Sequence, residues 1–167
     1  MPSDANTARM SRIGFGWDSH EFQAGIPLKI GGLELPHHSG LAGHSDGDVL
    51  LHALTDALLG AVAAGDIGSY FPPSDPQWKD ADSAVFLREA MKQAAARGYV
   101  VGNVDCTLVL AAPKIGPHAQ AIRESIAGLL GVEPGQISVK AKTPEGVGTD
   151  NAAIAHVVVL LTEIPWP

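Results

Sequence analysis

Apolar positions along this chain follow two periods, and the change from one to the other predicts where strands and helices lie. Short apolar or alternating runs predict strands at four places: residues 11–17, 100–112, 137–142 and 152–164. Helical spacing with capping residues predicts helices at three: residues 48–64, 82–97 and 117–130. Gly31 and Gly32 interrupt the apolar run over residues 28–35 and predict a tight hairpin. The last run, 152–164, also permits a buried helix.

The segments between these elements are rich in glycine, proline and small polar residues. We expect loops at residues 37–48 and 65–82, and a connection as long as the second is often functional or mobile. Strands and helices mix without strict alternation, which predicts an α+β fold: a single-domain open mixed sheet with helices packed on one side. Residues 1–10 are expected to be a flexible polar tail, and residues 11–164 a single domain.

Composition narrows the classes of function. The chain has 167 residues, 46% of them hydrophobic and 17% charged, as expected for one globular domain. A net charge of -7 argues against nucleic-acid binding but permits a small phosphorylated ligand held through metal ions. No apolar run is long enough for a transmembrane helix or a signal peptide, so we expect a cytoplasmic protein without membrane contact. The single cysteine, Cys106, excludes an intramolecular disulfide and is predicted to be a small buried residue.

The predicted helix that begins at Asp48 carries the first candidate for metal binding. Asp48, His52 and Asp56 recur every four residues and therefore share a face. A histidine with carboxylates on both sides is suited to bind a metal ion, and one carboxylate would accept the proton of its other ring nitrogen. The alternative is an ordinary polar face with a partly exposed histidine.

The first predicted strand supplies possible partners. Asp18 and His20 are two positions apart, so their side chains point to the same side of a sheet. Together with His52 they form a two-histidine, one-carboxylate set that suits zinc with an open fourth position. A chain with seven histidines offers many such sets, so the pattern alone is only moderately specific.

Two loops add candidates for phosphate binding. The stretch "GHSDGD" leads into the helix at Asp48, where free N–H groups and His44 could face an anion, or where aspartates could simply cap the helix. The stretch "KAKTPEG" offers Lys142 and Thr143 to phosphate and Glu145 to a hard cation such as Mg²⁺, or it is a surface turn. The loop at 111–118 could wrap a ligand or merely turn.

Taken together, these segments resemble one family, the 2-C-methyl-D-erythritol 2,4-cyclodiphosphate synthases of non-mevalonate (MEP) isoprenoid biosynthesis. The resemblance spans Arg12 to about Leu161 and rests on five stretches in order: "RIGFGWDSHEF", "GLAGHSDGDVLLHALTDALLGA", "GDIGSYFP", "GYVVGNVDCTLVLAAPKIGPH" and "VKAKTPEGVG". It implies a ferredoxin-like or bacillus chorismate mutase-like fold. It also implies a lyase that converts 4-diphosphocytidyl-2-C-methyl-D-erythritol 2-phosphate into the cyclic diphosphate and CMP.

The resemblance also implies roles for individual residues. Asp18, His20 and His52 match zinc ligands, and Glu145 matches the residue that holds a second divalent cation, Mg²⁺ or Mn²⁺. Groups that stabilise the transition state are matched by His44 and Thr143. The implied substrate-binding set joins these segments to the two loops: Asp18, Ser19, His20, His44, Ser45, Asp66, Ile67, Gly68, Phe71, Leu110, Ala111, Ala112, Pro113, Lys114, Ile115, Gly116, Lys142, Thr143, Pro144 and Glu145.

The implied assembly is a homotrimer with active sites between subunits. This chain has no arginine between Glu145 and its end, so we expect no arginine-based anion site on the trimer axis. Pro73, Lys142 and Thr149 also differ from many relatives, which have an acidic residue, a threonine and a phenylalanine there. Two other classes stay open: a zinc phosphoesterase that releases phosphate by hydrolysis, and a non-catalytic nucleotide- or metal-binding module.

Overall fold

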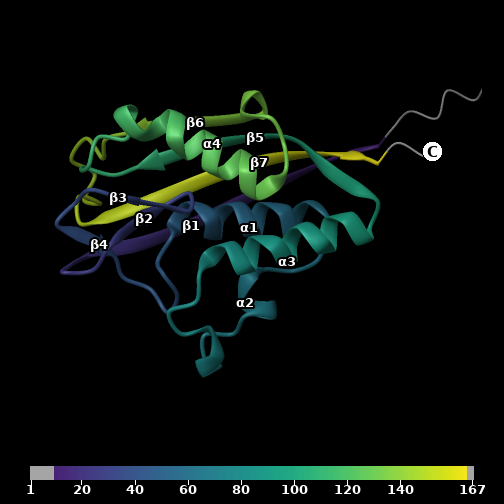
Figure 1. Ribbon diagram of the computed structural model, residues 1–167. Coiled ribbons are helices and arrows are strands. Elements are labelled where there is room, and N and C mark those ends of the chain that lie inside the picture. Colours follow the sequence, from purple (N-terminus) through teal and green to yellow (C-terminus); the bar gives the residue numbers. More distant parts are fainter. Residues whose placement is uncertain (1–9, 165–167) are drawn as a thin grey trace, which may run out of the picture.

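The main sheet of the protein has five strands and is open at both edges (Figure 1). The computed structural model describes residues 10–164, so the predicted tail at 1–10 lies outside the described residues except for Met10. The strand order is β4 (Ser39–Leu41), β1 (Ser11–Ala24), β7 (Ala152–Glu163), β5 (Tyr99–Val109) and β6 (Ile137–Lys142). Only β5 and β6 are parallel, and the other neighbours are antiparallel.

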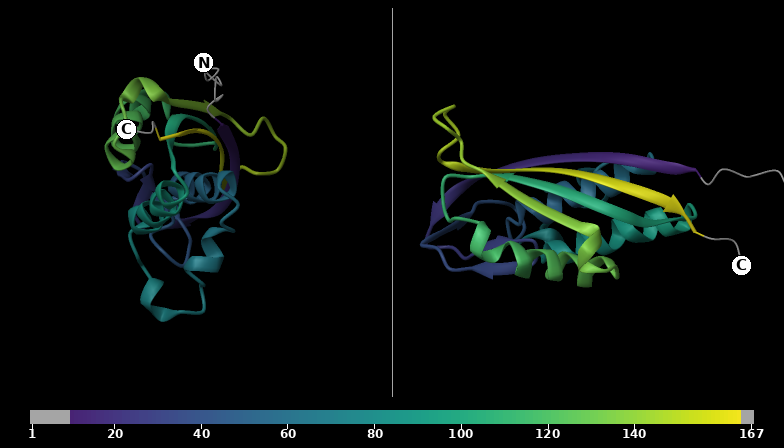
Figure 2. Two further views of the ribbon diagram at one scale, coloured as in Figure 1. Left: turned by 90° about the vertical axis from the view of Figure 1, so that its right-hand side faces the viewer. Right: turned by 90° about the horizontal axis from the view of Figure 1, so that it is seen from above.

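Three helices cover one face of this sheet, and the opposite face is bare (Figure 2). They are α1 (Val49–Ala61), α3 (Ser83–Ala96) and α4 (Ala119–Leu130). A small hairpin of β2 (Leu28–Ile30) and β3 (Leu33–Leu35) turns through Gly31 and Gly32, both at positive φ. The predicted α+β class and hairpin are therefore confirmed.

Side chains of strand β7 alternate between the face that the helices cover and the bare face. Every second side chain is fully buried against the helices: Ala153, Ala155, Val157, Val159 and Leu161. This alternation identifies residues 152–163 as a strand and excludes the helical alternative. On the bare face, Ile13, Phe15 and Trp17 of β1 are 73%, 60% and 50% exposed.

Two glycines of β1 bring helix α1 into direct contact with the sheet. A Cβ atom at Gly14 would lie 1.8 Å from the carbonyl oxygen of Ala57, and one at Gly16 would lie 1.8 Å from that of Ala53. Any side chain there would push the helix away. Asp18 and His20 follow on the same face of β1, so their side chains point toward the N-terminal half of α1.

The structure differs from the predicted elements in several places. Strand β1 continues to Ala24 because Phe22, Gln23 and Ala24 pair with β4, which lies in a predicted loop. The segment 65–82 contains α2 (Ile67–Tyr70) and a 3₁₀ turn at Pro76–Trp78, each too short for sequence periodicity to reveal. A further 3₁₀ turn, Gly116–His118, precedes α4, and another, Pro134–Gln136, precedes β6. Helix α1 has no broad polar face, because the sheet covers one side and α3 packs on another.

Candidate metal centre and active site

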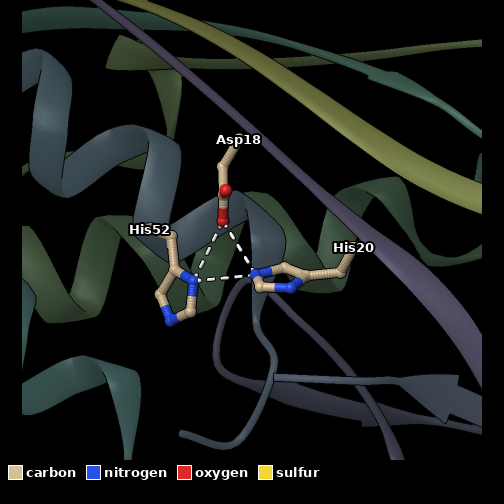
Figure 3. Close-up of side chains that lie close together, drawn as sticks. All are labelled: Asp18, His20 and His52. Carbon is tan, nitrogen blue, oxygen red and sulfur yellow. Dashed lines mark hydrogen bonds and ion pairs between the residues drawn. The ribbon is translucent and has the colours of Figure 1, made fainter. Parts of the chain in front are cut away.

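Asp18, His20 and His52 meet at one point between β1 and α1 (Figure 3). Asp18 Oδ2 lies 2.9 Å from His20 Nε2 and 3.0 Å from His52 Nδ1, and the two ring nitrogens are 3.1 Å apart. One oxygen and two imidazole nitrogens at this spacing could hold a single divalent ion, and zinc favours such a donor set. The predicted ligands are therefore brought together, and the donor set fits a metal ion.

The same contacts change the proton affinity of two of these groups. Burial alone would raise the pKa of Asp18, but hydrogen bonds and charge attraction from His20 and His52 hold it well below its ordinary value. Burial would lower the pKa of His20, but its hydrogen bond to Asp18 raises it above 6.5. The carboxylate therefore stays ionised, and a proton competes with a metal ion for His20.

The predicted carboxylate partners of His52 lie elsewhere. Asp48 is the N-cap of α1: its Oδ1 accepts from the N–H groups of Leu51 (3.0 Å) and Gly31 (2.9 Å), and its Oδ2 accepts from that of Gly32 (2.7 Å). Buried completely, Asp48 joins α1 to the β2–β3 turn. The four-residue spacing correctly placed it near His52 along the helix, but three backbone donors turn its carboxylate away from the imidazole.

Asp56 has a different partner as well. Its Oδ1 accepts a 2.7 Å hydrogen bond from the Ile67 N–H and so fixes the start of α2. Burial raises the pKa of Asp56, and that hydrogen bond only partly offsets the effect. Asp56 lines the cavity beside the three candidate ligands, and in the part of the chain that the structure describes no hydrogen bond joins it to the His52 ring.

Hydroxyl groups, not carboxylates, face the second ring nitrogen of His52. Nε2 lies 2.8 Å from Ser83 Oγ and 3.0 Å from Ser45 Oγ. Ser83 is fully buried at the start of α3, and its hydroxyl also bonds to Asp46. Sequence analysis missed Ser83, because a serine at a helix start reads as part of the cap, and nothing in the spacing connects it to residue 52.

A cavity of about 260 Å³ opens beside the three candidate ligands. Its lining includes four further residues of the predicted substrate-binding set: His44, Ser45, Ile67 and Phe71. Pro73, Trp78 and Phe86 line it too, and of these only Pro73 drew attention in the sequence. Aromatic rings pack here, with Phe71 and Phe86 centroids 4.5 Å apart. We call this space, with its three ligands, the metal cavity.

A second cavity of about 560 Å³ lies at the carboxyl ends of β5 and β6. These strands are parallel, so the chain leaves both at the same edge, and the Leu110 N–H donates to the Lys142 carbonyl (3.1 Å). The residues that line it include eight members of the predicted substrate-binding set: Leu110, Pro113, Lys114, Ile115, Gly116, Lys142, Thr143 and Glu145. It shares no lining residue with the metal cavity. We call it the loop cavity.

The remaining predicted substrate residues lie outside both cavities. Ala111 and Ala112 line a neighbouring hollow beside His37 and His38, and Pro144 is buried. Asp66 caps α2 through Ser69, and Gly68 lies on the same short helix. Ser19 follows Asp18 on β1, so its side chain points to the opposite face of the sheet.

Fold and site together define a class: a single-domain α+β protein with a two-histidine, one-carboxylate site for a divalent metal ion beside a substrate-sized cavity. Within the described residues, no helix has the length and apolar character needed to cross a membrane. The YgbB family model matches residues 11–162, and the chain belongs to this family.

Relatives and solved structures agree with this assignment and with the resemblance found in the sequence. The 2-C-methyl-D-erythritol 2,4-cyclodiphosphate synthase of Koribacter versatilis (strain Ellin345) is 69% identical over 152 residues, covering 91% of this chain and 98% of the relative. A bifunctional enzyme IspD/IspF of Rhizorhabdus wittichii is 56% identical, and the match covers 87% of this chain but 38% of that protein. A solved structure of a 2C-methyl-D-erythritol-2,4-cyclodiphosphate synthase in a CDP-bound form superimposes with a TM-score of 0.85 at 45% identity, over 90% of this chain and 99% of that one.

Proposed function

We propose that this protein is a metal-dependent lyase that cyclises 4-diphosphocytidyl-2-C-methyl-D-erythritol 2-phosphate and releases CMP. The observation that carries the proposal is the convergence of Asp18, His20 and His52 beside a cavity in a chain of this family. In the reaction, an oxygen of the 2-phosphate attacks the β-phosphorus as the bond to CMP breaks. The attacking oxygen is already anionic, so no protein nucleophile is required.

The metal cavity is the proposed zinc site. Asp18, His20 and His52 would hold Zn²⁺, and Glu145 would hold a second ion, Mg²⁺ or Mn²⁺, together with the substrate diphosphate. Bound there, divalent ions neutralise phosphate charge and favour in-line displacement at phosphorus. The chain itself has a net charge of -7, so positive charge from the ions is needed to attract a polyanionic substrate.

The polar groups of the protein would orient the two reacting phosphates. His44 and Ser45 precede α1 and line the metal cavity, and their side chains would donate to phosphate oxygens. In the loop cavity, Thr143 and Lys142 would hold the phosphates of the leaving nucleotide. Fixing the attacking oxygen near phosphorus supplies a proximity effect of several kcal/mol.

A homotrimer would join the two cavities, which are separate within one chain. His44 and the three zinc-ligand candidates line one cavity, whereas Thr143 and Glu145 line the other. The bare sheet face exposes Ile13, Phe15 and Trp17, an apolar surface of the kind that a second copy covers. We propose that three chains bury this face, so that the metal cavity of one subunit adjoins the loop cavity of its neighbour.

The decisive experiment offers the diphosphocytidyl substrate to the purified protein with Zn²⁺ and Mg²⁺. Phosphorus NMR should record one CMP and one cyclic diphosphate per substrate, and a chelator should stop both. Release of inorganic phosphate or a linear product would instead identify a hydrolase. Binding without turnover would identify a non-catalytic module.

Mixing two inactive variants tests the shared active site. His52→Ala damages the metal cavity, and Glu145→Gln damages the loop cavity. After subunit exchange at equal amounts, about one quarter of the sites would combine two intact halves if each site spans two chains. Recovery of about one quarter of the wild-type rate supports the assembly, whereas no recovery, or a monomeric mass in solution, contradicts it.

A further inference from the structure

His52 lies between two competing hydrogen-bond acceptors. Asp18 Oδ2 is 3.0 Å from its Nδ1, and Ser83 Oγ is 2.8 Å from its Nε2. A neutral imidazole carries one proton, so only one ring nitrogen donates while the other presents a lone pair. Nδ1 is the nitrogen that faces the other two candidate ligands, so a metal ion requires the proton to be on Nε2.

The hydroxyl of Ser83 can accept that proton because its own hydrogen has another destination. Ser83 Oγ donates to Asp46 Oδ1, and the Ser83 backbone N–H donates to Asp46 Oδ2 (3.2 Å). An ionised carboxylate only accepts hydrogen bonds, so the direction of the chain is set: His52 Nε2–H to Ser83 Oγ–H to Asp46. Ser83 is fully buried, so water does not compete with these contacts.

Asp46 is kept ionised by its other contacts. Lys29 Nζ lies 3.3 Å from Oδ2, the Asp48 N–H lies 3.3 Å from Oδ1, and the Asp46 side chain is only 9% exposed. Burial alone would raise the pKa of Asp46, but the Ser83 hydrogen bonds, the Asp48 N–H and the Lys29 charge hold it below its ordinary value.

Ser45 contacts the same nitrogen but lacks such support. Its Oγ is 3.0 Å from Nε2, and His52 is its only hydrogen-bond partner among the described residues. Its hydroxyl can therefore rotate to donate or to accept. Ser45 alone would leave the position of the imidazole proton undecided.

We propose that Ser83, backed by Asp46, is a positioning residue of the metal centre that holds the His52 proton on Nε2 and leaves Nδ1 free to bind the ion. The inference rests on the proposed metal site. It predicts that Ser83 and Asp46 act in series, through one chain of hydrogen bonds, although neither touches the metal ion.

The test measures Zn²⁺ affinity by competition with a chelating dye for the wild type, Ser83→Ala, Asp46→Asn and the double variant. Loss of a hydrogen-bond partner behind a ligating histidine typically weakens metal binding about 10- to 100-fold, so we expect at least about tenfold for Ser83→Ala. Asp46→Asn should cost less, because an amide oxygen still accepts. Because the groups act in series, the double variant should bind about as weakly as Ser83→Ala.

A matched control separates positioning from general destabilisation. Thr55→Val removes another fully buried hydroxyl, on α1 beside His52, which donates to the Leu51 carbonyl and not to the imidazole. It should keep wild-type Zn²⁺ affinity. If circular dichroism shows that Ser83→Ala is unfolded at the assay temperature, the Zn²⁺ affinity of Asp46→Asn is compared with that of Thr55→Val instead.

Proton NMR of the zinc-loaded protein gives a readout that a purely structural role would not move. The His52 Nε2–H should appear as a downfield, slowly exchanging signal in the wild type and Thr55→Val, and should shift upfield and exchange faster in Ser83→Ala. Wild-type affinity and an unchanged signal in Ser83→Ala would overturn the inference, as would fully additive losses in the double variant. Failure of the wild type itself to bind Zn²⁺ would instead refute the proposed metal site.

Discussion

The metal cavity and the loop cavity are built from opposite kinds of structure. The metal ligands come from the middle of a long strand and a buried helix, and the His52 side chain is 11% exposed. Lys142 and Glu145 of the loop cavity are exposed. Lys142 ends the edge strand β6, and Glu145 lies on the loop that follows and projects beyond the sheet (Figure 2). Glu145 has φ +52°, a backbone conformation that suits a turn.

This difference indicates how the two halves reach their working geometry. Packing around the metal cavity places all three ligands within 4.8 Å of one another in a single chain. In the loop cavity, Glu145 is the one carboxylate among the described residues of the lining and its Oε1 already accepts from Thr143 Oγ1, so a hard cation there needs further oxygen ligands from substrate or a neighbouring subunit. We therefore expect the first half to bind its ion alone and the second to need partners.

The largest effect is expected from His52→Ala. Removing one of three ligands should abolish stoichiometric Zn²⁺ binding and lower kcat/KM by at least about 10³-fold, equivalent to about 4 kcal/mol. CMP binding to the loop cavity should persist, because the two cavities share no lining residue. Metal analysis and calorimetry measure both. Exposed His38, which lines neither cavity, supplies the control His38→Ala, and loss of CMP binding in His52→Ala would refute the independence of the halves.

Glu145→Gln should have the next largest effect, of a different kind. We expect kcat/KM to fall about 100-fold, with an increased Mg²⁺ requirement, because a neutral amide binds a hard cation weakly. Zn²⁺ content should stay at the wild-type level. Asp150→Asn, at an exposed carboxylate on the same loop, is the matched control. A Zn²⁺ loss in Glu145→Gln would show that the two cavities are not independent.

Lowering the pH should affect the two halves unequally. The pKa of His20 is above 6.5, so a proton occupies its ring as the pH falls through that range, and Zn²⁺ affinity should drop about tenfold per unit below it. In the metal-free protein, the His20 contribution to stability changes with pH in the opposite direction to the Zn²⁺ affinity. The His20 contribution to stability is full below pH 6.5 and is lost as the pH rises through its raised pKa.

At acidic pH, Asp18 limits the stability of the metal-free protein. Its lowered pKa means that its contribution is present above pH 3.8 and is lost as the pH falls through the native-state value. Thermal melts with and without Zn²⁺, and dye competition from pH 5 to 8, test these signs. CMP binding by the loop cavity, measured across the same range, should change less, and equal pH slopes would contradict the comparison.

The smallest effect is expected from Asp56→Asn. Burial raises the pKa of Asp56, so its ionised form opposes folding above pH 3.8. The asparagine oxygen can still accept from the Ile67 N–H, so the melting temperature of the metal-free protein should rise by about 1–3 °C at pH 7. Glu145→Gln, at an exposed carboxylate, should leave it unchanged. A lower melting temperature in Asp56→Asn would mean that the hydrogen bond to Ile67 requires the charge.

Local spacing was sufficient to predict part of this architecture. An apolar run predicted the last strand, with a buried helix as the alternative, and helical spacing predicted α1 with His52 on it. Asp18 and His20 were assigned correctly to one face, because a strand sends alternate side chains to the same side. Donor chemistry then suggested that these two and His52 form a zinc set, one of many that seven histidines allow, and the resemblance to relatives singled out this one.

Tertiary packing decided the partners of these side chains. Whether an aspartate supports His52 or caps a helix depends on which backbone donors come near, and for Asp48 these belong to Gly31 and Gly32, brought in by a hairpin distant in sequence. Ser83 meets His52 only because α3 packs on α1. Sequence periodicity states which face a residue occupies. Hydrogen-bond partners distant in sequence are chosen by close packing, which no local pattern encodes.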